Sequence, residues 1–485
     1  MRNMPIRIGT IHFVGIGGIG MSGIADILFD MGYQVQGSDM ADGANVGRLR
    51  DKGITVHIGH CQSHLVDAAN EEVSVVVISS AVKDDNAELA AARAKGIPIV
   101  RRAEMLAELM RLKWSIAIGG THGKTTTTSL VGAVLDEANF DPTIINGGIV
   151  NRYGTNIRLG QSEWMVVEAD ESDGTFTRLP ATISVVTNMD PEHMENYGSF
   201  DDVRRAYLQY VENIPFYGFG VLCADHDEVL ALKAQVQDKK LITYGFSPQA
   251  DVRAVNVKTD MDGSTFDVVF SPWLRDDTEQ RLNDIYLAMP GEHNIQNAMA
   301  AIAIGYEIGA AFPLMKKALS EFGGVRRRFT KTGETGGVLV VDDYGHHPVE
   351  IEAVLKTARL SADRRGGRLI AVMQPHRYSR LQGLFEDFCT CFNDADSVVV
   401  MDVYAAGETP IDGISKDTLV EGIKRHGHRD VINLENDKNL PHLIAESVKE
   451  NDIVVCLGAG DITNYANALP AALQDISDAK TRKAS

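Results

Sequence analysis

Gly119-Gly-Thr-His-Gly-Lys-Thr-Thr-Thr-Thr128 is the most informative stretch of this sequence. Residues 115–118 before it are mostly apolar and predict a buried strand, and residues 126–135 after it carry apolar side chains at helical spacing. A glycine-rich turn between a strand and a helix directs backbone N–H groups at one spot, which suits a phosphate. Lys124 can reach the terminal phosphates, and the Thr125 hydroxyl can ligate Mg²⁺. The loop is one residue shorter than the standard phosphate loop, and a tight turn that merely contains a lysine is the alternative.

Length and composition restrict the class of protein. The chain has 485 residues, which is about right for three domains, and 44% of them are hydrophobic, as in ordinary globular proteins. A formal net charge of −19 argues against a nucleic-acid-binding protein. The five cysteines form no CxxC pair, and no apolar run is long enough to span a membrane. We therefore expect no nucleic-acid or membrane partner, and a cytoplasmic protein.

Residues 1–113 predict a first α/β domain with a mostly parallel sheet. A strand is followed by Gly15-Ile-Gly-Gly-Ile-Gly20 and a helix, and Asp39 lies about 20 residues further on, at the end of the next strand. This pattern is typical of a dinucleotide-binding fold. It indicates a diphosphate at the start of the helix and a ribose hydroxyl near an acid, so both NAD and other diphosphate ligands fit it.

Residues 114–323 predict the second domain, which contains the lysine-bearing turn. Residues 164–168 form an expected strand that ends in Glu168, and His193 follows another expected strand. Ligands of open α/β sheets bind at the carboxyl ends of strands, so both side chains are site candidates, and Glu168 is a candidate Mg²⁺ ligand. Three further acids could equally cap or solvate the same loop: Asp170, Glu171 and Asp173.

His293, Asn294 and Asn297 gather at the start of an alanine-rich helix that is expected to run through residues 298–308. Their side chains could hydrogen-bond an adenine edge, or could cap the helix. Spacing alone favours the capping interpretation.

Residues 324–485 predict a third α/β domain, in which polar residues again follow the strands. Tyr344 and His346 come after one expected strand, and Arg377 and Arg380 come after another. If the segment with the two arginines is helical, their spacing puts them on one face, where two guanidinium groups can hold a carboxylate. Two solvated arginines are the alternative.

The order of these domains and their motifs resembles the Mur ligase family, which joins amino acids to a UDP-linked muramyl precursor in bacterial cell-wall synthesis. The resemblance covers nearly the whole chain. It rests on the short phosphate loop, Glu168, His193 and the segment 293–297. Within the family, the stretches 11–23, 342–348 and 374–380 resemble members that attach L-alanine to UDP-N-acetylmuramate.

The resemblance implies three α/β domains: a Rossmann-like N-terminal domain, a central P-loop ATPase-like domain with extra strands, and a Rossmann-like C-terminal domain. It implies that 1–113 binds the UDP-sugar, 114–323 binds ATP and 324–485 binds the amino acid. The expected UDP-sugar-binding residues are Gly15, Gly17, Gly18, Gly20, Ser38, Asp39, Ser79 and Ser80. The expected ATP-binding residues are Gly120, Thr121, His122, Gly123, Lys124, Thr125, Thr126, His293, Asn294, Asn297 and Arg326.

The same resemblance implies the chemistry. ATP would phosphorylate the lactyl carboxylate of UDP-N-acetylmuramate, and L-alanine would attack the acyl phosphate. The expected catalytic residues are Lys124, Glu168, His193 and His346; the metal ligands are Thr125, Glu168 and His193; the L-alanine-binding residues are Tyr344, His346, Arg377 and Arg380. Two Mg²⁺ ions are expected. Several family members carry a carbamylated lysine after the metal histidine, but no lysine follows His193 before Lys233, so none is predicted.

Three other functions remain open from the sequence. A recycling ligase would add a whole tripeptide to the same acceptor. A P-loop sensor would bind UDP-sugars without cleaving ATP in response to an amine. A nicotinamide oxidoreductase would use only the first glycine motif, and Lys124 and Glu168 argue against it. We expect a monomer or a weak homodimer.

Overall fold

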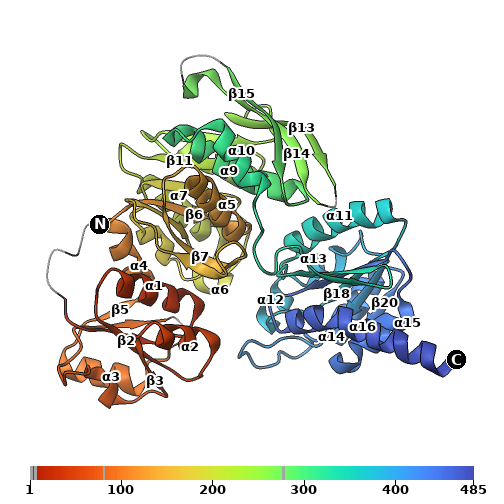
Figure 1. Ribbon diagram of the computed structural model, residues 1–485, viewed down its shortest axis with the longest axis horizontal. Coiled ribbons are helices and arrows are strands. Elements are labelled where there is room, and N and C mark those ends of the chain that lie inside the picture. Colours follow the sequence, from red (N-terminus) through yellow and green to blue (C-terminus); the bar gives the residue numbers. More distant parts are fainter. Residues whose placement is uncertain (1–3, 5–7, 80–81, 261, 276–278, 485) are drawn as a thin grey trace. The chain divides into compact units, whose positions relative to one another are not determined.

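The computed structural model describes residue 4 and residues 8–79, 82–260, 262–275 and 279–484. They form two compact units (Figure 1). The first contains residues 1–257, 266–287 and 295–323, and the second contains 258–265, 288–294 and 324–485. The first unit holds two sheets and the second holds one.

The N-terminal sheet has five parallel strands. In spatial order they are β3 (Thr55–Ile58), β2 (Val35–Asp39), β1 (Ile11–Val14), β4 (Val75–Ile78) and β5 (Ile99–Arg101). The helices are α1 (Ile19–Asp30), α2 (Ala44–Asp51), α3 (Ala87–Lys95) and α4 (Arg102–Arg111). The parallel order confirms the predicted Rossmann-like arrangement, and it brings the ends of β1, β2 and β3 to one edge of the sheet.

The central sheet has ten strands. In spatial order they are β15 (Gln280–Leu287), β14 (Ser264–Phe270), β13 (Val252–Thr259), β12 (Leu241–Gly245), β11 (Phe219–Cys223), β10 (Ile183–Val186), β6 (Trp114–Gly119), β9 (Trp164–Glu168), β7 (Thr143–Val150) and β8 (Thr155–Arg158). The helices are α5 (Lys124–Glu137), α6 (Met194–Tyr197), α7 (Phe200–Glu212), α8 (Asp227–Gln235), α9 (Glu292–Ile308) and α10 (Phe312–Ser320). β6 lies between β9 and β10 and runs parallel to both, so the candidate loops that follow these three strands meet at one edge.

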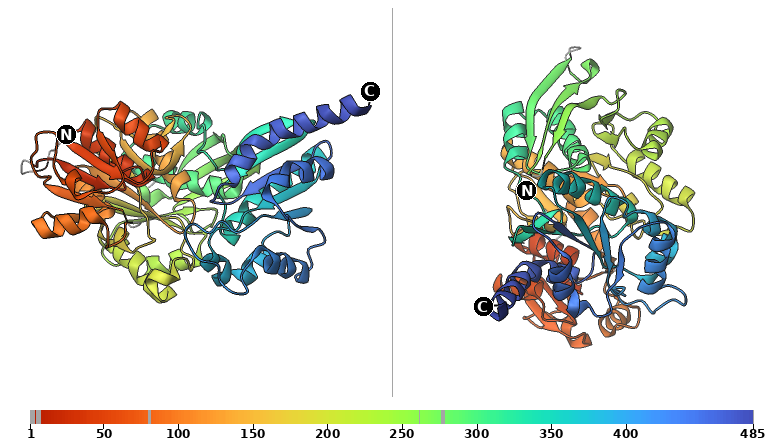
Figure 2. Two further views of the ribbon diagram at one scale, coloured as in Figure 1. Left: turned by 90° about the horizontal axis from the view of Figure 1, so that it is seen from below. Right: turned by 90° about the vertical axis from the view of Figure 1, so that its right-hand side faces the viewer.

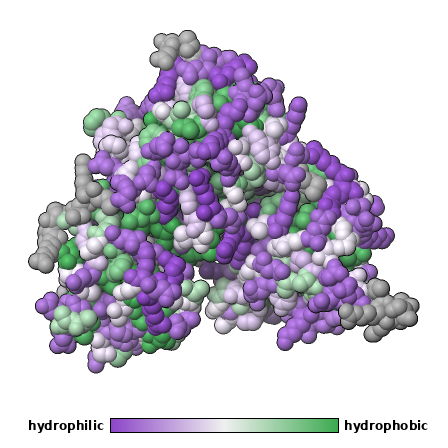
Figure 3. All heavy atoms as spheres, in the orientation of Figure 1, coloured by the Kyte–Doolittle hydropathy of each residue, from purple (hydrophilic) through white to green (hydrophobic). Residues whose placement is uncertain are grey.

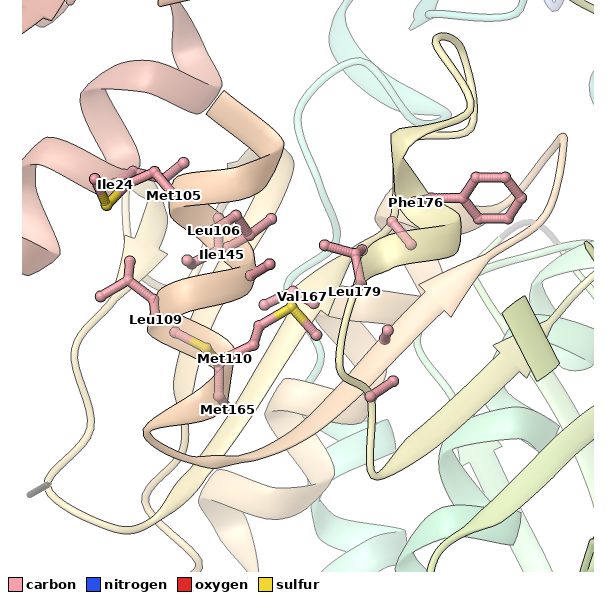
Figure 4. Packing of buried hydrophobic residues seen from close by; sticks show 14 of the residues in the cluster. Ile24, Met105, Leu106, Leu109, Met110, Ile145, Met165, Val167, Phe176 and Leu179 are labelled. Carbon is pink, nitrogen blue, oxygen red and sulfur yellow. The ribbon is translucent and has the colours of Figure 1, made fainter. Parts of the chain in front are cut away.

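A continuous apolar core joins the two sheets of the first unit (Figure 4). α4 places Met105 beside Ile24 of α1 and Met110 beside Met165 of β9, and Leu109 belongs to the same cluster. Leu109 and Met110 are almost completely buried. Because α4 directly precedes β6, this packing fixes the strand that leads into the phosphate-loop turn.

The C-terminal sheet has six strands, and only β16 pairs with its neighbour antiparallel. In spatial order they are β16 (Thr330–Thr335), β17 (Val338–Asp343), β21 (Ile453–Leu457), β18 (Leu369–Met373), β19 (Ser397–Val400) and β20 (Val431–Asn433). The helices are α11 (Pro348–Arg365), α12 (Tyr378–Gly383), α13 (Phe385–Thr390), α14 (Lys416–Arg425), α15 (Leu440–Ser447) and α16 (Ile462–Ala484). Alternate residues of β18 join two clusters: Leu369 and Met373 face the side of α11, and Ile370 and Val372 face α16. The sheet is therefore covered on both faces.

The α/β class and the order of the main elements are confirmed, and two expectations about local structure are wrong. The polar composition of residues 272–284 predicts a loop, but β15 begins at Gln280. The position of residues from Gln474 onward at the end of the chain predicts a frayed tail, but α16 continues to Ala484 (Figure 2), in line with the helix propensity of its alanine and lysine residues. The face in Figure 3 is mainly hydrophilic at its periphery, and no helix among the described residues is long and apolar enough to cross a membrane.

Candidate active site

The glycine-rich turn 119–124, called here the phosphate-loop turn, joins β6 to α5, as predicted. Gly120 and Gly123 have φ angles of 136° and 79°, which residues with a Cβ atom rarely adopt. Lys124 is the first residue of α5, and its Nζ donates hydrogen bonds to the carbonyl oxygens of Gly120 and Thr121 at 2.6 and 2.9 Å. The ammonium group is therefore folded back over the turn that precedes it.

Glu171 is the third partner of Lys124, with Oε1 2.7 Å from Nζ. The side chains are only 16% and 6% exposed. Burial alone would lower the pKa of Lys124, but the Glu171 carboxylate outweighs it and raises that pKa, so the lysine stays charged. Burial raises the pKa of Glu171 against the opposing effect of Lys124. From the sequence, Glu171 could have either a functional or a capping role, because spacing does not say which acid of the loop turns toward the lysine.

Glu168 ends β9 on the same edge of the sheet. Its Oε2 accepts a hydrogen bond from the Gly147 N–H at 2.8 Å. A Cβ at position 147 would lie 2.5 Å from Glu168 Oε1, so the glycine leaves room for this carboxylate. Glu168 also acts on the charge of Lys124, which places both predicted catalytic groups in one electrostatic environment.

A group of possible metal ligands lies beside this pair. Glu171, Glu192 and His193 have ligand atoms that all lie within 4.8 Å of one another. His193 adopts a φ of 58° at the start of α6, and its Nε2 is 4.0 Å from Glu192 Oε1. Two carboxylates with one imidazole suit a divalent cation, so the residues present fit the expected Mg²⁺. The group includes His193 but not Glu168, and Thr125 is buried in the first turn of α5.

The loop after β10 holds the phosphate-loop turn in place. The His122 N–H donates to Asn188 Oδ1 at 2.7 Å, and the Asp190 N–H donates to Thr121 Oγ1 at 2.9 Å. His122 Nε2 lies 3.3 Å from Asp190 Oδ2. Burial would raise the pKa of Asp190, but hydrogen bonds with His122 and His226 outweigh it and lower the pKa far below its usual range. The side chains of Thr121 and His122 thus already have protein partners.

Asn297 packs against the beginning of α5. Its Oδ1 lies 3.1 Å from the Thr127 hydroxyl, which donates to it, and both side chains are buried. A Cβ at Gly123 would lie 2.5 Å from the same oxygen. Asn297 therefore contacts the phosphate-loop region rather than capping its own helix.

His293 and Asn294 lie in the first turn of α9, in the second unit. Asn294 Nδ2 donates to the carbonyl oxygen of Pro290 at 2.7 Å, which is not an N-cap hydrogen bond. Burial lowers the pKa of His293 to about 4, so its ring is neutral at physiological pH. The Asn294 amide nitrogen thus bonds a carbonyl oxygen of the preceding segment.

We expect Gly123→Ala to raise the KM for ATP about tenfold, because the new methyl group meets Asn297 in a backbone conformation that alanine disfavours. Gly154→Ala is a matched control: Gly154 also has a positive φ, of 67°, but a Cβ there would meet nothing within 4 Å. Steady-state kinetics with ATP varied measures the difference. Equal KM values for the two variants would contradict the contact.

The glycine turn after β1 has the predicted tight geometry. Gly15 has a φ of 79°, and the Gly18 N–H donates to the Gly15 carbonyl oxygen at 3.3 Å. The Gly17 peptide is held on both sides, because its N–H donates to Asp39 Oδ2 at 2.8 Å and its carbonyl accepts from Asn45 Nδ2 at 2.9 Å. Asp39 therefore contacts the turn itself, in addition to any ribose hydroxyl it could reach.

Ser38 supports this turn from inside the domain. Its carbonyl oxygen accepts from the Gly15 N–H at 2.8 Å, and its hydroxyl donates to Glu88 Oε2 at 2.6 Å. His60 Nδ1 lies 3.0 Å from the same hydroxyl. Burial alone would raise the pKa of Glu88, but hydrogen bonds to His12 and Ser38 outweigh it and lower that pKa to about 2. The Ser38 side chain is thus fully buried, and its hydroxyl is bonded inside the domain.

Two more predicted residues lie near the turn. Gly20 faces Arg102, since an added Cβ would lie 3.2 Å from Arg102 Cδ, and Arg102 Nη2 donates to Asp170 Oδ2 at 3.1 Å. Ser79 lies beside the first glycine of the turn, where an added Cβ would be 3.3 Å from Ser79 Oγ. Ser80 lies outside the described residues.

Tyr344 follows β17 and is covered by two arginines. The guanidinium carbons of Arg327 and Arg328 lie 4.6 and 5.2 Å from the centre of its ring. Arg327 Nη2 also donates to the Gly458 carbonyl oxygen at 2.5 Å. Arg326, the arginine of this run that was predicted to bind ATP, is exposed.

The predicted L-alanine-binding residues come together at one edge of the C-terminal sheet. His346 Nδ1 lies 3.3 Å from Glu350 Oε2, and the His346 ring lies 5.9 Å from the ring of His376. Arg380 Nη1 is 3.1 Å from His376 Nδ1. Arg377 precedes α12 with a φ of 69°, so the condition for two arginines on one helical face, a helix that contains both, is not met. His376 lies inside the motif 374–380 but was not among the candidate residues.

Three family models match most of the chain. The model described as Mur ligase family, catalytic domain, matches residues 10–114. The Mur ligase middle domain matches residues 118–305, and the model described as Mur ligase, glutamate ligase domain, matches residues 327–460.

Curated relatives match over almost the full length. The chain is 61% identical over 473 residues to UDP-N-acetylmuramate–L-alanine ligase of Rhodospirillum centenum, covering 98% of this chain and 96% of the relative. It is 60% identical over 476 residues to the enzyme with the same description from Rhodospirillum rubrum, covering 98% and 97%.

Solved structures show the same architecture. The UDP-N-acetylmuramate–alanine ligase of Thermotoga maritima matches with a TM-score of 0.78 and 29% identity, over 97% of this chain and 100% of that one. A murein peptide ligase of Psychrobacter arcticus matches with a TM-score of 0.68 and 23% identity, over 96% and 99%, which shows the shared fold alone.

Proposed function

This chain belongs to the Mur ligase family and has UDP-N-acetylmuramate–L-alanine ligase activity in peptidoglycan synthesis, and we propose that it forms the amide through an acyl phosphate. A carboxylate is a poor electrophile, so an amine does not displace its oxygen directly. Transfer of the γ-phosphoryl group of ATP turns that oxygen into a leaving group. The amine then attacks, and the tetrahedral intermediate collapses to amide and phosphate.

We propose that residues 120–126 and Asn297 bind ATP, and that His293, Asn294 and Arg326 serve the same nucleotide. The observation that carries this proposal is the position of Lys124. This charged lysine folds over a glycine turn and lies beside acids at the ends of neighbouring strands. Its ammonium group would offset the charge that builds on the phosphoryl oxygens during transfer.

We infer that the expected Mg²⁺ ions are held by the acids and histidine around Lys124. The candidate ligands are Thr125, Glu168 and His193, to which Glu171 and Glu192 are now added. Mg²⁺ bound there would neutralise phosphate charge. Since no carbamylated lysine is predicted after His193, two carboxylates beside this histidine are a suitable replacement.

We propose that residues 1–113 bind the UDP-sugar at the glycine turn after β1. Gly15, Gly17, Gly18 and Gly20 would lie against the pyrophosphate at the start of α1. The side chains of Asp39, Ser79 and Ser80 complete the predicted set, and Ser38 holds the turn through its carbonyl oxygen. The other two parts, 114–323 and 324–485, would bind ATP and the amino acid. A cytoplasmic location, where ATP is supplied, and a monomeric or weakly dimeric state remain predictions.

We propose that Arg377 and Arg380 hold the L-alanine carboxylate, and that Tyr344 and His346 line the rest of its pocket. His346 would accept a proton from the attacking amine, with Glu350 3.3 Å away to stabilise the imidazolium.

Removing that proton acceptor is expected to change the pH dependence of the rate. A neutral imidazole is needed as a base, so kcat/KM for L-alanine should fall on the acidic side in the natural enzyme. In His346→Gln this acidic limb should disappear and the rate at neutral pH should fall about tenfold, since water takes over part of the role. A profile of unchanged shape would remove His346 from this role.

The overall proposal is tested by ADP formation from ATP with UDP-N-acetylmuramate, with and without L-alanine. We expect ADP formation to depend on both, and L-alanine to be preferred over the tripeptide that a recycling ligase would add. Tight UDP-sugar binding without amine-dependent ADP formation would instead support a sensor.

A further inference from the structure

The segment between β19 and α14, residues 401–415, docks on the loop that carries the two candidate carboxylate-binding arginines. Tyr404 and His376 form an isolated parallel bridge. The Tyr404 N–H donates to the Pro375 carbonyl oxygen at 2.8 Å, and the Arg377 N–H donates to the Tyr404 carbonyl oxygen at 2.9 Å. The backbone on both sides of His376 is therefore fixed by one residue from another loop.

The side chain of Tyr404 extends this contact. Its ring stacks on the His376 ring, with 5.6 Å between centres and 11° between planes. The ring is accommodated by Gly460, because a Cβ there would lie 2.6 Å from Tyr404 Cγ. Arg380 can only donate to His376 Nδ1, so the ring is held with that nitrogen as acceptor. A chain of contacts thus runs from Tyr404 through His376 to Arg380.

Glu408, from the same segment 401–415, holds the part of the arginine-bearing loop where α12 begins. Its Oε1 accepts from the Ser379 hydroxyl at 2.6 Å, and its Oε2 accepts from the Ser379 N–H at 3.0 Å. Ser379 lies in the first turn of α12, where a carboxylate is favoured by the helix dipole. Arg377, just before this helix, has a positive φ of 69° without being glycine. Such a conformation persists only where the surroundings impose it.

We propose that Tyr404 and Glu408 are positioning residues, which hold Arg377 and Arg380 in the arrangement that captures the carboxylate of the amine substrate. The inference rests on the proposed L-alanine site. Neither side chain needs to touch L-alanine. Tyr404 fixes His376 and the strained backbone of Arg377, and Glu408 fixes the start of the helix that carries Arg380.

The test compares Tyr404→Ala, Tyr404→Phe and Glu408→Gln by steady-state kinetics, with each of the three substrates varied in turn. Misplacing the guanidinium groups weakens substrate capture, so Tyr404→Ala should raise the KM for L-alanine about tenfold and Glu408→Gln about fivefold. Tyr404→Phe keeps the stacked ring and the backbone hydrogen bonds, and should stay within about twofold of the natural enzyme. For all three, the KM for ATP and kcat at saturation should change less than about twofold.

Two controls separate the possible results. Tyr286→Ala removes a tyrosine of similar exposure, 37% against 39%, and should leave the KM for L-alanine unchanged. Arg380→Ala should raise the KM for L-alanine more than Tyr404→Ala does.

If Arg380→Ala has this effect and Tyr404→Ala has none, the positioning role is overturned while the L-alanine site stands. If Arg380→Ala also has no effect, the proposed site fails. Tyr404→Ala could also lose both kcat and ATP binding. If Tyr404→Phe loses them as well, the cause is general unfolding, and this result would also overturn the inference.

Discussion

Lys124→Ala is expected to reduce kcat about 10³-fold or more, because the variant loses the cation that offsets charge on the transferring phosphoryl group. In the present structure this ammonium group is bonded to two carbonyl oxygens of the turn and to Glu171. The Glu171 carboxylate keeps the ammonium group charged, and the two carbonyl oxygens hold it against the turn. UDP-N-acetylmuramate should still bind, since its proposed site lies on another sheet.

Single-turnover phosphate release and equilibrium binding of the UDP-sugar measure the two effects separately. Lys113→Ala is the matched control. Lys113 is also largely buried, and its Nζ donates to the backbone carbonyl oxygens of Ser162 and Gly160 at 2.6 and 3.5 Å, but it precedes β6 instead of following it. We expect that variant to lose stability and to keep its turnover per folded molecule. Full turnover in Lys124→Ala would contradict the proposed mechanism.

His193→Asn is expected to raise the Mg²⁺ concentration for half-maximal rate about 100-fold and to lower kcat by about the same factor. The ligand atoms of His193, Glu171 and Glu192 all lie within 4.8 Å of one another, so the imidazole can share a cation with both carboxylates. Asparagine keeps the left-handed backbone conformation that His193 adopts, because asparagine tolerates a positive φ. The loss should therefore come from the ligand and not from the fold.

Titration of the rate with Mg²⁺ measures the effect of His193→Asn on catalysis. Electron paramagnetic resonance with Mn²⁺ measures its effect on metal binding directly. His428→Asn is the control, since its ring lies 3.0 Å from the Ala395 carbonyl oxygen in the second unit and should not affect the metal. If His193→Asn binds Mn²⁺ as the natural enzyme does, His193 is not a ligand.

Much of the fold follows from local pattern in the sequence. Short apolar runs predicted the strands that end at Gly119 and Glu168, and their register confirms parallel pairing. Ser199 followed by Asp201 and Asp202 is a sequence signal for the start of α7, and the Ser199 hydroxyl does accept from the Asp202 N–H. β15 was missed because pairs of polar residues, Gln280-Arg281 and Asn283-Asp284, interrupt the alternation of its buried apolar residues and give it the composition of a loop.

The candidate site was less predictable than the fold, because its contacts join residues far apart in sequence. Glu171 meets Lys124 across 47 positions, and Tyr404 meets His376 across 28. Neither spacing carries a periodic signal. The burial of Ser38 was equally hidden, since a serine at the end of a strand can face a ligand or the domain interior. Spacing within one turn indicated Lys124 and Thr125, and it carried no signal for the contacts that Glu171 and Tyr404 make across loops.

The most direct measurement follows oxygen from the acceptor carboxylate. UDP-N-acetylmuramate labelled with ¹⁸O in its lactyl carboxylate is converted with ATP and L-alanine, and the phosphate is examined by mass spectrometry. If the carboxylate is phosphorylated before the amine attacks, one labelled oxygen leaves with each phosphate, and the amide keeps the other. Phosphate without the label, formed together with the amide product, would contradict the acyl-phosphate mechanism.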